Sequence, residues 1–545
     1  MVGYAEGFVP VTCGCVNKES KRRNRQHRQT HLILAVGMAR CAVRAALSGA
    51  TNERLCTRVG SVRLAVRAVT SQRDVIYLGR TCGLTTSRRT STIRPLLMRS
   101  QFIALVALFT CTFALAQSYE SKPRDPAFEN FKLLKAPKNS GLMLRQGDRL
   151  AICGDSITEQ KMYSRIMEDY LTMCVPELAV TVRQFGWSGE RVPGFLGRMT
   201  NDCLRFSPTV ATTCYGMNDH EYRPYEARIG QTYRDTSRAM VEAFKAHDVR
   251  VVLGSPGCVG KIPFWVKSAS GTVEDLNLNL CTLRNIDIEL AQTEHVAFAD
   301  IFWPMLQAGV TARKEWGTNY AIAGKDGVHP AWAGHAIMAY AFLKALGLDG
   351  DLGQFEVDLK RGTMKTSRGH ELISARDRQF EIKSSRYPFC ACVAETDPGD
   401  SYPSCAKDNP TSDNSIRSAL TLIPFNQQLN RLMLVAKHGN SRTYLVTWGA
   451  QQKTFTARQL ARGINLAEEF PLNPFSAAFG KVDAAVAAKQ AYETRQIKES
   501  FRSPEAKTDM EGVATRTERD REPLAQAIRA AFVPVTHTLK IEPEK

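Results

Sequence analysis

Apolar and polar positions follow two different periods between about residues 149 and 346. Short runs of β-branched and small apolar residues alternate with longer stretches in which apolar residues recur every three or four positions. The short runs predict five strands, at residues 149–153, 179–184, 209–214, 249–253 and 295–299. The longer stretches predict helices over residues 159–174, 229–247, 275–292 and 332–346. This alternation favours a parallel sheet with helices on both faces.

The pattern changes after Gly350. Residues of about 355–400 and 418–465 alternate apolar with polar side chains, which predicts a small β-rich module. Helices are predicted over 476–501 and 522–532, and the charged stretch 502–521 between them is predicted to be a mobile loop. We therefore expect four parts, namely an N-terminal linker (117–144), an α/β domain (145–350), a β-rich module (351–470) and a helical C-terminal segment (471–545).

Residues 98–117 have the organisation of a secretory signal peptide. Met98 is followed by one arginine, by an apolar stretch of 15 residues, and by Ala114-Leu115-Ala116, which fits a signal-peptidase site. We expect cleavage near Ala116–Gln117 and a secreted or periplasmic protein. The apolar stretch is shorter than the roughly 20 residues that span a bilayer, so no stable membrane span is predicted.

Most of the formal charge of +18 lies upstream of this segment. Residues 1–97 hold 17 Lys and Arg against 4 Asp and Glu, whereas the rest of the chain holds 55 against 50. Because a signal peptide belongs at an N-terminus, we interpret residues 1–97 as a non-native, disordered upstream extension, with translation beginning at Met98. The alternatives are a basic cytoplasmic arm before an uncleaved anchor and a basic arm for nucleic acid. The balanced remainder does not indicate a nucleic-acid-binding domain.

Nine cysteines follow residue 117. Cys153 and Cys214 end two of the predicted strands, where small buried thiols are expected. Cys390, Cys392 and Cys405 share a polar stretch rich in Pro and Asp, which predicts one disulfide there in an oxidising compartment. No spacing of Cys and His is typical of zinc, so we predict no metal.

Two motifs together indicate a nucleophile and its base. Gly154-Asp155-Ser156 lies between the first predicted strand and the first helix, at the carboxyl edge of the sheet, where a helix N-terminus favours developing negative charge. A serine hydroxyl needs a base within hydrogen-bonding reach, and that base needs an orienting carboxylate. Asp326-Gly-Val-His329 supplies both just before another helix. Either motif alone also fits a helix cap or a turn, but the pair indicates a Ser–His–Asp triad.

Two further loops carry hydrogen-bond donors. Gly216-Met-Asn218-Asp219 follows the third predicted strand, and an Asn side chain aimed at a reacting carbonyl stabilises the transition state by ~3–4 kcal/mol. The stretch from Phe185 to Glu190 follows the second strand and contains two glycines, which allow a backbone N–H to approach a substrate closely. Both loops are expected at the same sheet edge as Ser156.

In this order, the four blocks resemble those of the SGNH, or GDSL-type, serine esterases over about residues 145–348. The resemblance implies a flavodoxin-like three-layer α/β/α fold and cofactor-independent hydrolysis of esters through an acyl-enzyme. The residues that match are Ser156 as nucleophile, His329 as base, Asp326 as its partner, and Ser156, Gly189 and Asn218 as oxyanion-hole donors. Many members have Asn where this chain has Gln184, which leaves Gly186 as an alternative to Gly189.

The sequence says less about the substrate. Trp187, Glu190 and Asp219 flank the donor loops and are candidate substrate-binding residues, although each fits a solvated loop equally well. The expected partner is an ester, and a secreted member with a β-rich appendage fits an acylated carbohydrate. The alternatives are a small-ester or lysophospholipid esterase, and a non-catalytic carbohydrate-binding protein on the same scaffold. The sequence does not predict the oligomeric state.

Overall fold

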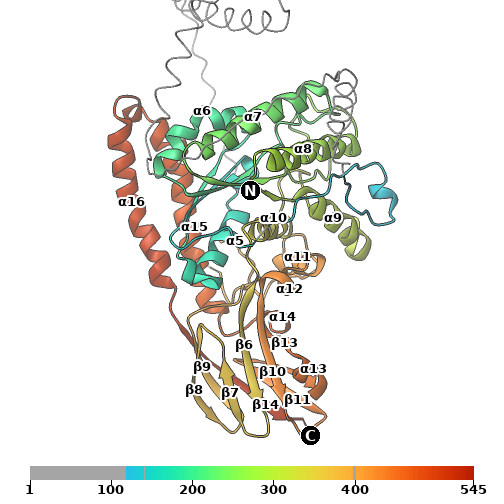
Figure 1. The fold of residues 1–545 in the computed structure, drawn as a ribbon, viewed down its shortest axis with the longest axis vertical. Helices are drawn as coiled ribbons and strands as arrows, with labels where there is room; N and C mark the ends of the chain where they lie inside the picture. Colours follow the sequence, from blue (N-terminus) through green and yellow to red (C-terminus); the bar gives the residue numbers. More distant parts are fainter. Residues whose placement is uncertain (1–117, 140, 397–399, 545) are drawn as a thin grey trace, which may run out of the picture. The chain divides into compact units, whose positions relative to one another are not determined.

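A five-stranded parallel sheet forms the centre of the α/β domain (Figure 1). This computed structural model describes residues 118–139, 141–396 and 400–544. The strand order is β2-β1-β3-β4-β5. The strands are β1 (Arg149–Gly154), β2 (Thr181–Gly186), β3 (Val210–Cys214), β4 (Arg250–Gly254) and β5 (Ala297–Ala299). All five predicted strands are confirmed, while the predicted signal peptide and upstream extension lie outside the described residues.

Helices cover both faces of this sheet, because the side chains of β1 are buried on both of its sides. Leu150 and Ile152 pack into one apolar core, and Ala151 and Cys153 pack into another on the opposite face. Helices α5, α9 and α10 lie on the first face and α6 and α7 on the second, while α8 contributes to both cores. The helices are α4 (Ser156–Glu159), α5 (Tyr163–Asp169), α6 (Val192–Asp202), α7 (Ala227–Lys245), α8 (Val273–Thr293), α9 (Phe302–Trp316) and α10 (Trp332–Ala345). The expected three-layer α/β/α fold is confirmed.

The predicted β-rich module is present as two sheets that pack face to face. One sheet has the order β13-β10-β6-β7 and the other β12-β11-β14-β9-β8. The ring of Phe355 in the first sheet lies 5.2 Å from His370 and 6.1 Å from His537 in the second, centroid to centroid. The strands are β6 (Asp351–Asp358), β7 (Thr363–Thr366), β8 (His370–Arg376), β9 (Gln379–Ser384), β10 (Arg431–Lys437), β11 (Thr443–Trp448), β12 (Gln451–Thr456), β13 (Ile464–Asn465) and β14 (Val535–Pro543). The last strand therefore comes from the segment that was expected to be helical.

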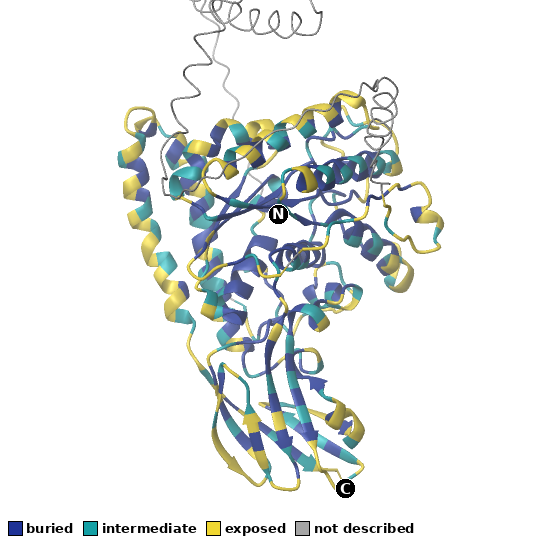
Figure 2. Cartoon of the chain, viewed as in Figure 1, coloured by how far each residue is buried: buried dark blue, intermediate teal, exposed yellow. Residues whose placement is uncertain are grey.

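Short helices border the module, and two long ones follow it. The short ones are α11 (Ile416–Leu422), α12 (Phe425–Leu429), α13 (Ala457–Arg462) and α14 (Leu466–Glu469), and the long ones are α15 (Ser476–Lys498) and α16 (Met510–Ala531). The predicted mobile loop over 502–521 is wrong, because α16 begins within it. Asp509 caps that helix by accepting a hydrogen bond from the Gly512 N–H, and Val513, Ala514 and Thr517 are buried. Figure 2 shows α16 exposed along its outer face, whereas the central strands are buried.

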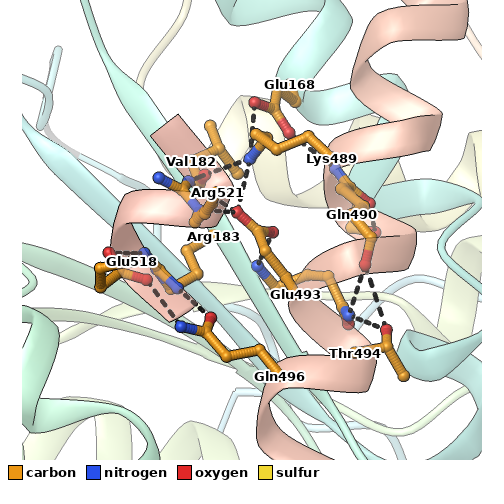
Figure 3. Close-up of polar contacts among 12 residues, drawn as sticks. Glu168, Val182, Arg183, Lys489, Gln490, Glu493, Thr494, Gln496, Glu518 and Arg521 are labelled. Atoms are coloured by element: carbon orange, nitrogen blue, oxygen red, sulfur yellow. Dashed lines mark hydrogen bonds and ion pairs between the residues drawn. The ribbon is translucent and has the colours of Figure 1, made fainter. Parts of the chain in front are cut away.

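Side chains of the two long helices form hydrogen bonds with backbone groups at the free edge of the central sheet (Figure 3). Strand β2 pairs only with β1, so its outer backbone groups lack a strand partner. Lys489 Nζ donates to the Val182 carbonyl at 2.6 Å, and Arg521 donates to the same oxygen at 3.3 Å. The Glu493 carboxylate accepts from the Gln184 N–H at 3.2 Å. Three ionic side chains therefore replace the missing strand.

These buried charges also neutralise one another. Lys489 lies 3.0 Å from Glu168 of α5 and 2.9 Å from Glu493, and Arg521 lies 2.6 Å from Glu493. Lys489, Glu168 and Glu493 are almost fully buried. Burial raises the pKa of Glu493, but Lys489 and the arginines outweigh it and hold that pKa below its usual value. The network therefore consists of charges that compensate one another.

A disulfide joins Cys392 and Cys405, which confirms the one predicted in this stretch. Cys390 stays a buried thiol beside Asn473. Cys153 and Cys214 are buried free thiols, as expected. Over residues 118–139, 141–396 and 400–544, no helix combines the length and apolar character that crossing a membrane requires.

Candidate active site

Ser156 is the first residue of α4, immediately after β1. Asp155 caps this short helix, because its carboxylate accepts a hydrogen bond from the Ile157 N–H at 2.9 Å. Asp155 is itself buried, and that burial, with smaller contributions from nearby Asp219 and Glu190, raises its pKa to about 7 despite the bond from Ile157. The strand end and the cap together fix the position of the Ser156 backbone.

The predicted triad residues form an unbroken hydrogen-bonded chain. His329 Nε2 lies 2.8 Å from Ser156 Oγ, and His329 Nδ1 lies 2.7 Å from Asp326 Oδ2. Partial burial raises the pKa of Asp326, but hydrogen bonds from the N–H groups of His329 and Val328 and from the His329 ring lower it below its usual value. An ionised Asp326 that accepts from Nδ1 leaves Nε2 as the nitrogen that faces the serine.

Glycine shapes the loop that carries Asp326 and His329. Gly327 has φ +88°, and a Cβ at this position would lie 2.6 Å from the Lys261 carbonyl oxygen. The Gly260 N–H donates to the Gly327 carbonyl at 2.9 Å. The loop after β4 is thereby held against the loop of the triad, which a side chain at position 327 would prevent.

The loop after β2 is attached to the serine motif at two points. The Trp187 N–H donates to the Gly154 carbonyl at 3.0 Å, and the Ser188 hydroxyl donates to the Glu159 carboxylate at 2.6 Å. Gly186 N–H donates to Gln184 Oε1 at 2.9 Å, whereas the Gly189 N–H makes no hydrogen bond within the described residues. Gly189 also has φ +74°, and the space beside it is open. Of the two glycines, Gly189 therefore has the available donor.

Asn218 has a fixed amide orientation. Its Oδ1 accepts from the Tyr222 hydroxyl at 3.1 Å, and its Nδ2 donates to the Glu190 carbonyl at 3.1 Å. An amide nitrogen carries two N–H groups, so one remains for a substrate. Glu221 and Tyr222 have φ of +55° and +53°, and left-handed backbone costs roughly 1–2 kcal/mol for a residue with a side chain. Such strain is typical of functional loops.

Gly189 and Asn218 meet at one pocket of about 270 Å³. Tyr222 lines it together with Val266 and Ser268 of the loop after β4. The structure therefore brings both predicted donors together at the edge where β1 presents Ser156. The three candidate substrate-binding residues do not line this pocket.

Those three residues have other partners. Glu190 is buried, receives two hydrogen bonds from Arg198 and accepts from the Tyr215 hydroxyl. Asp219 is buried and accepts from the N–H groups of Val192 and Gly216, and burial raises its pKa to about 6. Trp187 lies against the guanidinium and ammonium groups of Arg198, Arg502 and Lys498. Their contacts hold the donor loops in place.

Residues 152–337 match the sequence profile of the GDSL-like lipase/acylhydrolase family. They form a GDSL-like lipase/acylhydrolase domain. The chain is thus a hydrolase of esters, and residues 351–544 are additional to the acylhydrolase domain.

Other known proteins are similar to parts of this chain. An acetylxylan esterase from Geobacillus stearothermophilus is 24% identical over 230 residues, which are 38% of this chain and 98% of that protein. Among solved structures, a gut microbial diltiazem-metabolizing enzyme has a TM-score of 0.59 at 20% identity and covers 74% of this chain and 100% of its own. A catalytic mutant of a Geobacillus stearothermophilus acetylxylan esterase has a TM-score of 0.32 at 22% identity and covers 38% of this chain and 97% of its own. Because the diltiazem-metabolizing enzyme covers 74% of this chain at a TM-score of 0.59, the similarity in fold extends beyond the acylhydrolase domain.

Sequence reasoning missed the aromatic residues beside His329. Trp265 stacks on the His329 ring, with centroids 5.7 Å apart and planes at 30°. Phe264 packs edge-on against Trp265 and is 84% exposed. Both lie in the loop after β4, at the sheet edge that carries the other site loops. The cluster Ile-Pro-Phe-Trp at residues 262–265 was the available signal, but it matches no catalytic motif of the acylhydrolase domain.

Proposed function

We propose that this protein is a secreted serine esterase that deacetylates carbohydrates, with Ser156, His329 and Asp326 as its catalytic triad. The observation that carries the serine mechanism is the hydrogen-bonded chain from Ser156 Oγ through the His329 ring to Asp326. A binding protein without catalysis would have no need for this alignment of three polar side chains.

The mechanism follows from the geometry. His329 Nε2 takes the proton of Ser156 as Oγ attacks the ester carbonyl, and it then protonates the leaving alcohol. Water activated by the same nitrogen attacks the acyl-enzyme, releases the acid and restores Ser156. Asp326 keeps Nδ1 protonated and stabilises the imidazolium.

Three N–H groups are assigned to the developing oxyanion. The Ser156 N–H lies at the start of α4, the Gly189 N–H has no partner within the described chain, and Asn218 keeps one amide N–H available. Removing one such donor typically lowers kcat by about 10²–10³. The Asn218 donor is the easiest to test, because it belongs to a side chain.

Two features support an acetylated carbohydrate as substrate. The pocket of about 270 Å³ beside the donors is lined largely by polar side chains, which suits hydroxyl groups better than a long acyl chain. Trp265 and Phe264 form an exposed aromatic surface next to His329, on which the apolar face of a sugar ring can lie. The similarity to an acetylxylan esterase is consistent with this substrate class. An esterase of small esters or lysophospholipids is the second candidate, favoured by the exposed Ile262 in the same loop.

Secretion is supported by the Cys392–Cys405 disulfide, since disulfides persist in oxidising compartments. N-terminal sequencing of the protein from its native source tests this part of the proposal. A mature N-terminus near Gln117 is expected, whereas recovery of Met1 contradicts both the cleavage and the start site at Met98.

Substitution of the proposed nucleophile tests the chemistry. Ser156→Ala should abolish hydrolysis of 4-nitrophenyl acetate and of acetylated xylo-oligosaccharides while leaving the unfolding midpoint unchanged. Ser270→Ala, at an exposed serine in the loop after β4, is the matched control and should keep full activity. A fluorophosphonate probe should label Ser156 alone. Activity retained in the Ser156 variant would exclude the triad, and a preference for octanoyl over acetyl esters would favour the second candidate.

A further inference from the structure

Two arginines line the pocket beside the oxyanion donors. Arg191 follows Gly189 in the loop after β2, and Arg223 follows the strained Glu221–Tyr222 turn. Glu221 is the only acidic residue that lines the pocket among the described residues. The lining therefore has more positive than negative charge, although the chain beyond residue 97 is nearly balanced.

The arginines around the pocket outnumber the nearby carboxylates. Arg228, which does not line the pocket, donates to both oxygens of Glu221 at 3.0 and 2.7 Å, and it lies 2.8 Å from Glu226. Pairing with Arg228, with smaller contributions from Arg191 and Arg223, lowers the pKa of Glu221 to about 2. Three positive charges therefore face the two glutamates, and one positive charge is left without a partner.

The contacts of the two lining arginines are correspondingly weak. Arg191 makes one hydrogen bond to Glu221, at 3.1 Å, and its side chain is 49% exposed. Arg223 Nε is 3.6 Å from the Glu221 carboxylate and has no hydrogen-bond partner among the described residues, and another nitrogen of its guanidinium lies 3.5 Å from Glu226. A guanidinium presents five donors in a planar fork that matches a carboxylate, so both side chains keep capacity for an anion.

The third wall of the pocket adds no negative charge. It is the loop of residues 255–272, which contributes Val266 and Ser268 to the lining and contains Lys261 and Lys267 but no Asp or Glu. Asp219 lies close to Arg191, but it is buried and its carboxylate faces two backbone N–H groups. No acidic side chain besides Glu221 thus opposes an anion in the described pocket.

We infer that the substrate carries an anionic group close to the scissile ester, and that Arg191 and Arg223 bind it. Because the pocket adjoins Gly189 and Asn218, a carboxylate or sulfate there sits within one sugar unit of the reacting carbonyl. An acetylated acidic saccharide is the class that fits both this charge and the aromatic surface of Trp265. The inference rests on the proposed function, since it names the substrate class of the same site.

Paired substrates of equal size test the charge. The kcat/KM of the full-length protein is compared for mono-acetylated digalacturonate and for mono-acetylated galactobiose, in which CH2OH groups replace the carboxylates. A second pair places the charge on the acyl side, with 4-nitrophenyl hemisuccinate against 4-nitrophenyl butyrate. We expect at least a tenfold preference for the acidic disaccharide, which decreases as salt is added because the pair is partly exposed. A preference for the hemisuccinate over the butyrate, without a preference between the disaccharides, also supports the anion site. It would place the anionic group of the substrate on the acid part of the ester.

Variants assign the preference to the pocket. Arg191→Gln combined with Arg223→Gln should lower the acidic-to-neutral ratio at least tenfold. Arg234→Gln combined with Arg238→Gln is the matched control, because it removes the same charge from α7 outside the pocket and should leave the ratio unchanged. Arg191→Lys should give an intermediate ratio, since it keeps the charge and loses the fork.

The outcomes separate the inference from the function on which it rests. A ratio near one in both substrate pairs, with hydrolysis that still depends on Ser156, overturns the anion site and leaves the esterase intact. A ratio that both double variants reduce equally also overturns it, because the effect would then come from net charge. The absence of any hydrolysis that depends on Ser156 removes both proposals.

Discussion

The Tyr222 hydroxyl donates a hydrogen bond to Asn218 Oδ1 at 3.1 Å. The Glu190 carbonyl can only accept and therefore fixes which end of the amide is the nitrogen, while the Tyr222 hydroxyl holds the oxygen end in place. Tyr222 therefore acts as a positioning residue for the proposed oxyanion donor. Its left-handed backbone indicates that the placement is maintained against local strain.

Removing this hydroxyl should affect turnover rather than substrate binding. Tyr222→Phe is expected to lower kcat about tenfold with little change in KM, and Asn218→Ala should lower it by about 10²–10³. Tyr225→Phe is the control, because the Tyr225 hydroxyl makes no hydrogen bond to another described residue. Equal kcat in the Tyr222→Phe variant and the unmodified protein would show that Asn218 needs no positioning.

Trp265 should influence catalysis through its contact with His329. An aromatic face next to a cation contributes about 0.5–2 kcal/mol, which corresponds to roughly 2- to 30-fold in rate when the imidazolium forms. Trp265→Ala is expected to lower kcat within that range for every ester, while Trp265→Phe retains most of the activity. Steady-state kinetics with ethyl acetate measure this effect without an aromatic leaving group. Tyr119→Ala, at another exposed aromatic residue, serves as the comparison.

Asp155 should make stability depend on pH. Its pKa is about 7 in the folded protein against an ordinary value of 3.8, so the folded state holds the proton more tightly. The stability it contributes is fully present below pH 4 and is lost as the pH rises through 7, on the order of 4 kcal/mol at most. Asp155→Asn should therefore lose less stability than the unmodified protein between pH 4 and pH 8 in urea unfolding. Exposed Asp235→Asn should follow the unmodified curve.

The ionic edge of the central sheet should be sensitive to the loss of one charge. Lys489→Met leaves Glu168 and Glu493 buried without their shared cation and frees the Val182 carbonyl, at a cost of about 3–5 kcal/mol. Lys481→Met, at an exposed position of the same helix, should cost little. Urea unfolding measures the loss of stability. Light scattering measures the aggregation that is expected from an open strand edge. Equal midpoints for the two variants would contradict the structural role of the network.

The disulfide should stabilise the C-terminal region. Cys392 and Cys405 are 13 residues apart, and closing a loop of this length contributes about 3 kcal/mol. The double substitution to Ser should lower the melting temperature, and dithiothreitol should then have no further effect. An unmodified protein whose melting temperature is insensitive to dithiothreitol would indicate that the bond contributes nothing measurable.

The central sheet and the proximity of Ser156 and His329 could be predicted because their signals are local. Strands β1 and β3 are buried on both faces, and their sequences are therefore runs of apolar and small residues. Ser156 and His329 each lie in a short motif between a strand and a helix, and the geometry of a parallel sheet places both at one edge. Their contact at 2.8 Å follows from that rule although 173 residues separate them.

Other features depended on partners that the sequence does not identify. Trp265 gains its importance from lying on His329, and nothing in its own neighbourhood indicates that contact. The first half of helix α16 was missed because its buried face between Val513 and Thr517 is small and interrupts a run of charges. The burial of Glu190 could not be predicted either, because a Glu in a glycine-rich loop does not indicate that Arg198, eight residues later, is its partner.

The way in which β2 is completed has a consequence for protein synthesis. Val182 and Gln184 emerge from the ribosome about 300 residues before Lys489, Glu493 and Arg521, which complete their hydrogen bonds. The acylhydrolase domain therefore spends most of translation with one strand unfinished, and a fragment that ends near residue 350 stays in that condition. Truncation at the end of the family domain would thus expose polar edge groups that the complete chain pairs.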